Sequence, residues 1–392
     1  MMRRIARTGL LAAAMLAGAG GGQAAELNTS VGMQAYAFSD DPAFAGQSAH
    51  EMRVLADLWG NVDLAPGLQF RFDANLTLGE HSFARIDEAT LRYDYGTGSL
   101  RLGADQHPWA RTEFARLSNV LNPRDFRADY EGDTLIGTPM LQWSTLAGTG
   151  TIDVIATGWA SGNAYRQPEQ RLRPSPDLIG GTVWERPRAT PGLALRYENS
   201  FDAVDLGVYL RRGPSYEAAL VPVPSGVAPY YPWVAQAGLD MQVTTGALIG
   251  KLELRHTTNQ PTRAGGRQDG WAAALGAEYT FFGVAGSDGD MMLFAEYAWD
   301  QRGRDAWQIW QDDLVLGARW SANTIANTRL SAGLQLDLDY DTRALRLRLE
   351  HRLADGLTAD LSVLHWLESD PADLVRDLRK DSHLQITIMR DF

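Results

Sequence analysis

The stretch Leu68-Gln-Phe-Arg-Phe-Asp-Ala-Asn-Leu-Thr-Leu78 decides the fold class, because apolar and polar side chains alternate along it. Such alternation indicates a β-strand with one apolar face. The same period recurs in 193–198, 204–211, 248–255, 328–339, 343–349 and 357–363. Lysine occurs only at Lys251 and Lys380, so Arg, Asp, Glu and Gln share the polar faces. We interpret the polar face as the lining of a lumen; the alternative is a periplasmic all-β protein.

Short and long connections alternate between the predicted strands. Short turns are predicted at 62–66, 96–98, 147–150, 201–203, 244–246, 285–289, 322–327 and 354–356. Longer connections are predicted at 39–50, 107–136, 161–188, 214–232, 259–267, 301–309 and 369–381, with brief ones near 79–83 and 339–342. This alternation is typical of a transmembrane antiparallel up-and-down barrel with short periplasmic turns and long extracellular loops. The sequence therefore predicts an all-β barrel of about eighteen strands, with sixteen as the alternative count.

The first residues predict export. Arg3, Arg4 and Arg7 precede an uncharged run of small and apolar residues from 9 to 22, and small residues follow at 24–25. This order is that of a secretory signal peptide. The sequence thus predicts a signal peptide at 1–25 and a barrel at 26–392, with its first strand at 31–39.

The end of the chain supports an outer-membrane location. Leu384, Ile386, Ile388 and the terminal Phe392 fall on one face of the last predicted strand. A last strand of this kind that ends in an aromatic residue resembles the assembly signal of Gram-negative outer-membrane barrels. Arg390 departs from that pattern, and near the membrane interface its long side chain can reach water. The resemblance implies that the barrel-assembly machinery is a partner through this strand.

Composition excludes several classes of function. The formal charge of −12 and the absence of a basic stripe argue against nucleic acid as a partner. The chain has no cysteine, and its seven histidines are scattered without metal-ligand spacing, so no metal or cofactor is expected. A Gly-x-Ser-x-Gly elbow is also missing, so we do not expect an enzyme.

The most distinctive segment is 102–127, which follows the fifth predicted strand. Pro108 ends that strand, Thr112 can cap a short helical turn, and Pro123 stops the turn. With its Asn122-Pro123-Arg124-Asp125-Phe126 motif, the segment resembles the third outer loop of porins and of poorly characterised porin-like families, which folds into the barrel. The resemblance implies an inward constriction loop at 107–136.

Charged residues of this loop are the predicted pore constriction: His107, Arg111, Glu113, Arg116, Arg124, Asp125 and Arg127. The predicted opposing lumenal wall consists of Arg71, Arg92, Arg101, Arg196, Arg255, Arg346 and Arg348. Facing charges in a narrow pore set ion preference, and guanidinium groups recognise carboxylate or phosphate. The alternative at each position is that these charges only brace one another inside a wet barrel. Between 108 and 127, four arginines stand against two acids, which predicts a weak anion preference.

A second basic run lies in the predicted loop 161–188. Arg166, Arg171 and Arg173 lie within it, and Arg186 and Arg188 lie at its end. These arginines are candidates for contact with lipopolysaccharide phosphates or with an anionic solute, and a solvated loop without a role is the alternative.

Together these features predict an outer-membrane porin-like channel for passive diffusion of small hydrophilic solutes. Outer-membrane lipid and lipopolysaccharide are the expected surroundings, and the porin analogy allows a homotrimer. The main alternative is an exporter of an anionic polysaccharide, because alginate-export barrels are similar in strand number and an arginine-rich lumen suits such a polymer. A closed structural or adhesive barrel is a third possibility.

Overall fold

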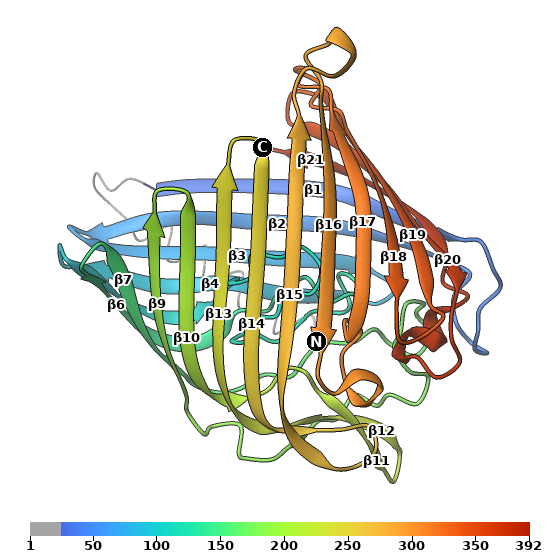
Figure 1. Cartoon of the computed structure of the whole chain (residues 1–392), viewed down its shortest axis with the longest axis horizontal. Helices are drawn as coiled ribbons and strands as arrows, with labels where there is room; N and C mark the ends of the chain where they lie inside the picture. The colour runs from blue at the N-terminus through green and yellow to red at the C-terminus, as the bar shows by residue number, and fades with distance from the viewer. Residues whose placement is uncertain (1–24) are drawn as a thin grey trace.

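The computed structural model describes residues 25–392, which form a closed antiparallel barrel of eighteen strands (Figure 1). Strand β1 (Ala25–Phe38) pairs with β2 (His50–Ala65) on one side and with β21 (His383–Asp391) on the other, which closes the sheet. The predicted all-β barrel and its strand number are confirmed. The predicted signal peptide lies outside the described residues except for Ala25, where β1 begins.

The remaining barrel strands follow in chain order. They are β3 (Leu68–Gly79), β4 (Phe83–Asp94), β5 (Gly98–Asp105), β6 (Thr138–Ala147), β7 (Gly150–Thr157), β9 (Gly192–Phe201), β10 (Val204–Pro214), β13 (Trp233–Thr245), β14 (Leu248–Pro261), β15 (Arg267–Phe281), β16 (Asp290–Asp300), β17 (Asp312–Ser321), β18 (Arg329–Asp337), β19 (Arg343–Ala354) and β20 (Leu357–Glu368). The first strand begins six residues before its predicted start at 31, because residues 25–30 pair with 57–62 of β2.

Short turns lie at one end of the barrel and longer loops at the other, as predicted. The connections 66–67, 148–149, 202–203, 246–247 and 355–356 contain only two residues each. Loops 106–137 and 158–191 are the longest at the opposite end. A small sheet in the long loops combines β8 (Val183–Trp184), β11 (Ala219–Val223) and β12 (Gly226–Tyr231). The remaining elements are the 3₁₀ turns η1 (Val284–Gly286), η2 (Gly303–Asp305) and η3 (Leu374–Leu378).

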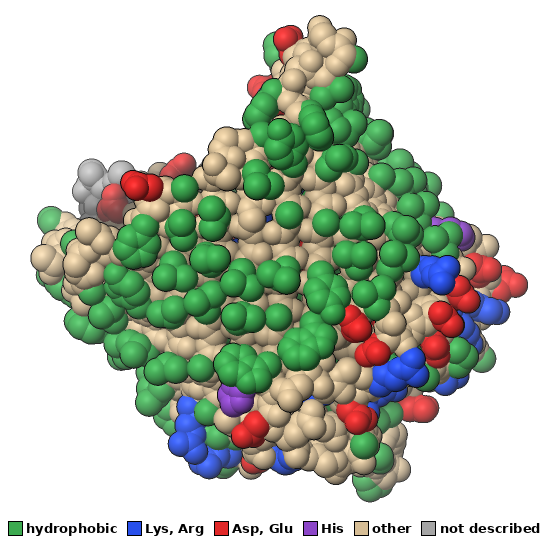
Figure 2. All heavy atoms as spheres, viewed as in Figure 1, with side chains coloured by type: hydrophobic (Ala, Val, Ile, Leu, Met, Phe, Trp, Pro, Cys, Tyr) green, Lys and Arg blue, Asp and Glu red, His purple; other side chains and the backbone are tan. Residues whose placement is uncertain are grey.

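The outer face of the barrel is apolar. Apolar side chains cover the visible strand wall, and charged side chains gather toward the long-loop end (Figure 2). Leu210, Leu275 and Leu347 are large exposed side chains of this face. Ile386 and Ile388 of the last strand and Phe392 just after it are also exposed, which agrees with their predicted common face, whereas Leu384 is half-buried. In residues 25–392, no helix is long and apolar enough to cross a membrane.

One cluster of buried apolar side chains lies inside the barrel. It forms where Leu117 of loop 106–137 meets the inward alanines Ala272 and Ala274 of β15 and Ala298 of β16. The lumenal face is therefore not polar throughout. Small residues make room at this wall for a loop that enters the barrel.

Candidate pore constriction

Loop 106–137 starts between β5 and β6 and crosses the lumen to strands β14 and β16. Its tip is fixed there by Glu253 of β14, a fully buried carboxylate. Oε1 of Glu253 accepts hydrogen bonds from the backbone N–H of Arg111 and Thr112 at 2.8 and 2.7 Å and from the Thr112 hydroxyl at 2.6 Å. Oε2 accepts the N–H of Ser118 at 2.7 Å. One wall carboxylate thus holds both ends of the tip 111–118.

A second wall carboxylate holds the middle of the tip. Glu296 of β16 accepts three consecutive backbone N–H groups, those of Glu113, Phe114 and Ala115, at 2.7–2.9 Å. Hydrogen bonds to an ionised carboxylate are stronger than neutral ones. The two glutamates therefore satisfy backbone donors that a loop inside a barrel would otherwise leave without partners.

The base of the loop is tied together by Asn122. Its Oδ1 accepts the N–H of His107 at 2.8 Å, and its Nδ2 donates to the carbonyls of Asp105 and Ile136 at 2.8 and 2.9 Å. The His107 ring is itself buried, with Nε2 3.1 Å from Oε1 of Gln142. His107 therefore belongs to the anchoring of the loop and presents almost no surface to the lumen.

Asp125 also serves the internal structure of the loop. It is fully buried and accepts the Nε and Nη2 donors of Arg127 at 2.7 and 2.9 Å. The Arg127 guanidinium stacks on Phe83, 4.0 Å from the ring centre, and Arg85 of β4 lies 3.6 Å from Asp125. Of the motif 122–126, Arg124 and Phe126 line a cavity, which lies on the long-loop side.

Besides Arg124 and Arg127, three predicted constriction residues keep partly exposed side chains, and each of these three is ion-paired. Arg111 contacts Glu198 at 2.7 Å and Asp240 at 3.1 Å. Glu113 lies 3.5 Å from Lys251 and 3.4 Å from Arg319.

Arg116 is paired within the loop, 2.8 Å from Asp133. Burial and the neighbouring Glu131 raise the pKa of Asp133 to about 8, although Arg116 lowers it.

The seven arginines of the predicted wall are also ion-paired. Arg196 binds Asp240 through two hydrogen bonds of 2.6 and 2.9 Å, and both side chains are buried. Arg346 of β19 pairs with Glu131 of the loop. The other five pairs are Arg71–Glu88, Arg92–Asp94, Arg101–Asp105, Arg255–Glu217 and Arg348–Asp360. Arg348 has the most exposed side chain of the seven, at 56%.

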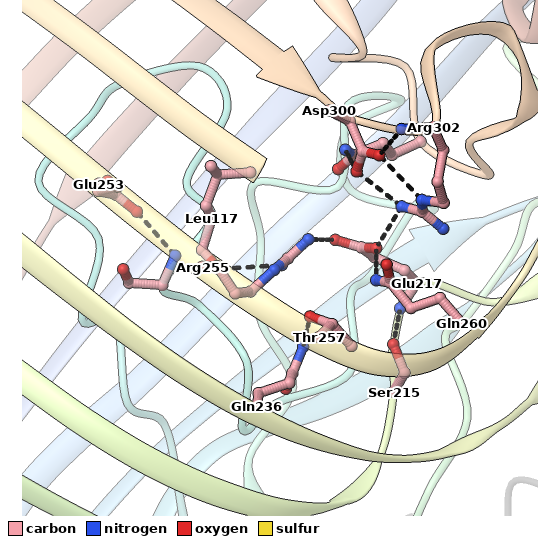
Figure 3. Close-up of polar contacts among 12 residues, drawn as sticks. Leu117, Ser215, Glu217, Gln236, Glu253, Arg255, Thr257, Gln260, Asp300 and Arg302 are labelled. Carbon is pink, nitrogen blue, oxygen red and sulfur yellow. Dashed lines mark hydrogen bonds and ion pairs between the residues drawn. The ribbon is translucent and has the colours of Figure 1, made fainter. Parts of the chain in front are cut away.

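Arg255 belongs to a buried network near the long-loop end (Figure 3). It donates to the carbonyl of Leu117 at 3.0 Å and pairs with Glu217, which also lies 3.3 Å from Arg302. Arg302 in turn binds Asp300 of β16 at 2.8 Å. The network joins loop 106–137 to β14, to β16 and to the loop after β10.

A charged cavity of about 660 Å³ lies between the loop and the wall from β16 to β21. Its charged lining balances: Arg116, Arg166, Arg319, Arg329, Arg346 and Arg348 against Glu113, Asp129, Glu131, Asp133, Glu350 and Asp360. A second cavity of about 260 Å³ lies on the β4 side of the loop and includes Asp87, Arg116 and Asp133. Arg116 and Asp133 thus border both cavities.

The arginines of loop 158–191 are largely folded inward. Arg166 pairs with Glu51 at 2.9 Å, and Arg171 pairs with Asp381 at 2.6 Å; both arginines are fully buried. Arg173 is buried against backbone carbonyls of its own loop. Arg166 and Arg171 therefore fasten the loop to β2 and to the segment just before β21, and Arg173 braces the loop itself. None of these three buried side chains is available to lipopolysaccharide. Arg186 and Arg188 stack on tryptophan rings.

The sequence did not identify Glu296, Lys251, Arg319 or Asp133 as parts of this site. Glu296 is one of several acids on the polar faces of strands, and no local pattern distinguishes it. Its role depends on closure of the barrel, which brings β16 opposite the loop between β5 and β6.

No family model and no curated protein sequence match the chain. Solved structures with a related arrangement include OmpT, an outer membrane protein of Vibrio cholerae, with 9% identity and a TM-score of 0.45 over 95% of this chain and 100% of that chain. OmpF of Salmonella typhi, in complex with daunomycin, shares 8% identity with a TM-score of 0.49 over 94% and 97%. A mutant of the Rh. blastica porin shares 12% identity with a TM-score of 0.46 over 94% and 100%.

Proposed function

We propose that this protein is an outer-membrane channel for passive diffusion of small hydrophilic solutes, with loop 106–137 as its constriction and a weak preference for anions. The observation that carries the proposal is the loop itself. It crosses the lumen and is held on the far wall by the carboxylates of Glu253 and Glu296.

The apolar exterior supports the membrane location. Large exposed apolar side chains on a monomeric soluble protein rarely form one continuous surface, and here they extend over the strand wall. A closed barrel leaves no unpaired strand edge, which is what a β-structure in lipid requires. In this setting Arg390, which stacks on Phe392, would lie at the membrane interface together with the short turns.

The ion pairs of the constriction support diffusion of small polar solutes. Charges that are paired across a narrow site keep it hydrated and polar without binding one ion tightly, and permeation requires sites that release what they bind. In this proposal the filter consists of Arg111, Glu113, Arg116 and Asp133, whereas His107, Asp125 and Arg127 hold the loop in shape.

The weak anion preference follows from the balance of charge in the 660 Å³ cavity. Its six arginines and six acids cancel only if every acid is ionised. Because the pKa of Asp133 is raised, part of its population is protonated at neutral pH, which leaves the lining with an excess of positive charge.

Single-channel conductance of the purified barrel in a planar bilayer under a KCl gradient tests the proposal. We expect open steps with a reversal potential that favours Cl⁻, and a smaller preference in Arg116→Ala. Arg376→Ala is the matched control, because Arg376 is an exposed arginine at the same end. A correctly folded barrel that does not conduct would exclude an open channel and favour a gated exporter or a closed structural barrel.

A further inference from the structure

A third cavity, of about 160 Å³, lies on the long-loop side of the constriction. Loop 106–137, the loops after β7, β10 and β16, and η3 all contribute to its wall. Its lining is rich in rings: Phe126, Tyr130, Tyr165, Tyr216, Trp307 and Trp310. Phe126 and Tyr165 stack with their ring centres 5.1 Å apart, so this part of the wall is ordered by its own packing.

Three charged side chains line this cavity, and two of them are neutralised. Glu217 binds Arg255 and Arg302, and Glu131 binds Arg346. Arg124 differs, because none of the ion pairs within residues 25–392 includes it. Its guanidinium has one hydrogen bond, from Nη1 to the carbonyl of Gly132 at 2.8 Å.

Arg124 is therefore a half-buried cation with spare donors. Burial lowers the pKa of its guanidinium, and arginine nevertheless stays charged in proteins. A guanidinium carries five N–H donors in a planar fork that matches a carboxylate. Asp133 and Glu217 attract this cation without forming an ion pair with it, and an anion in the cavity would give its free donors a direct partner.

Another polar group of the cavity wall lacks a partner. Nε1 of Trp307 is buried and has no hydrogen-bond acceptor. Indole nitrogen usually finds an acceptor when it is buried. A ligand with two acceptor oxygens would therefore suit the donors that Arg124 and Trp307 bring to the same cavity.

The size of the cavity limits the apolar part of such a ligand. An apolar protein cavity of about 150 Å³ admits benzene, and this one measures about 160 Å³. One aromatic ring would fit among the ring side chains. Aliphatic side chains such as Ile309 and Leu378 also line the cavity and add to its apolar surface.

We propose that this cavity binds a small carboxylate bearing one aromatic ring, with the carboxylate on Arg124 and the ring among the aromatic side chains. Tyr130 and Glu131 line both this cavity and the 660 Å³ cavity, so a bound solute would lie next to the larger cavity. We further infer that the channel transports the acid that binds here, and this step rests on the proposed channel function.

Calorimetric titration of the detergent-solubilised barrel with benzoate tests binding without any need for conduction. We expect saturable binding of benzoate, and no competition by acetate, which lacks the ring, or by benzyl alcohol, which lacks the charge. Arg124→Gln should raise the Kd at least about tenfold, since hydrogen bonds to charged groups are strong. Arg376→Gln removes an exposed arginine at the same end and should leave the Kd unchanged.

Ala218→Trp gives an independent test should Arg124→Gln fail to fold. Ala218 lines the cavity, so a tryptophan there should abolish benzoate binding while Arg124 remains in place. Absence of saturable benzoate binding to the folded wild-type barrel, or equal affinity in Arg124→Gln, would overturn the inference. A barrel that conducts KCl but does not bind benzoate would refute this site alone, and one that binds benzoate without conducting would refute the channel alone.

Discussion

Single carboxylates of the wall determine where the inward loop lies. Glu253 accepts four hydrogen bonds from residues 111–118. Each hydrogen bond to a charged group contributes roughly 1.5–3 kcal/mol. We expect Glu253→Ala to release the tip, so that single-channel conductance rises and open-state noise increases. The control is Glu88→Ala, because Glu88 contacts Thr90 and Arg71 and no residue of the loop. Unchanged conductance in Glu253→Ala would contradict the anchoring role.

Asp133 gives the constriction a dependence on pH. Burial and Glu131 raise its pKa to about 8, Asp129 adds to this effect, and Arg116 and Arg124 oppose it. A carboxyl with a raised pKa is neutral below that value and negative above it. The anion preference should therefore grow as the pH falls from 9.5 to 6.5, which the reversal potential in a KCl gradient measures. Asp133→Asn should keep the low-pH preference throughout, and an equal pH response in that variant would refute the assignment.

At the scale of elements, the sequence predicts strands better than it predicts loops. Alternation along 68–78 and 328–339 indicates strands because barrel residues face lipid and lumen in turn, and turns of two residues leave little choice of register. The small sheet could not be foreseen, because β8 has only two residues, Val183 and Trp184, and pairs with β12 far along the chain. The inward course of loop 106–137 was predicted from resemblance, whereas its contacts with Glu253 and Glu296 depend on closure of the barrel.

The loop and the barrel are separable elements, because every barrel strand pairs with two neighbours independently of the loop. We expect a variant with residues 111–118 replaced by a short Gly-Ser linker to assemble, to conduct severalfold more current and to lose its ion preference. Shortening the exposed turn 282–289 is the matched control and should change neither quantity. Heat-modifiable migration on gels verifies folding in both variants. If the variant without the tip conducts as much current as the wild type, the narrowest point of the channel lies elsewhere.

At the scale of the whole molecule, the apolar exterior makes the stability of the barrel depend on lipid. Leu275 is half exposed and lies in the middle of β15, where it pairs with Leu252 and Tyr297. An arginine on the lipid face near the bilayer midplane costs roughly 2–4 kcal/mol and almost nothing near the interface. Leu275→Arg should therefore lower the free energy of unfolding from lipid vesicles by about that amount, as measured by guanidinium titration. Ile325→Arg, at a highly exposed position in the connection between β17 and β18, should change the free energy of unfolding little.

If the barrel stood in water instead of lipid, Leu275→Arg would be neutral or favourable, because it would replace an exposed apolar side chain by a hydrated one. The sign and size of the change in unfolding free energy caused by Leu275→Arg thus decide whether the strand wall faces lipid.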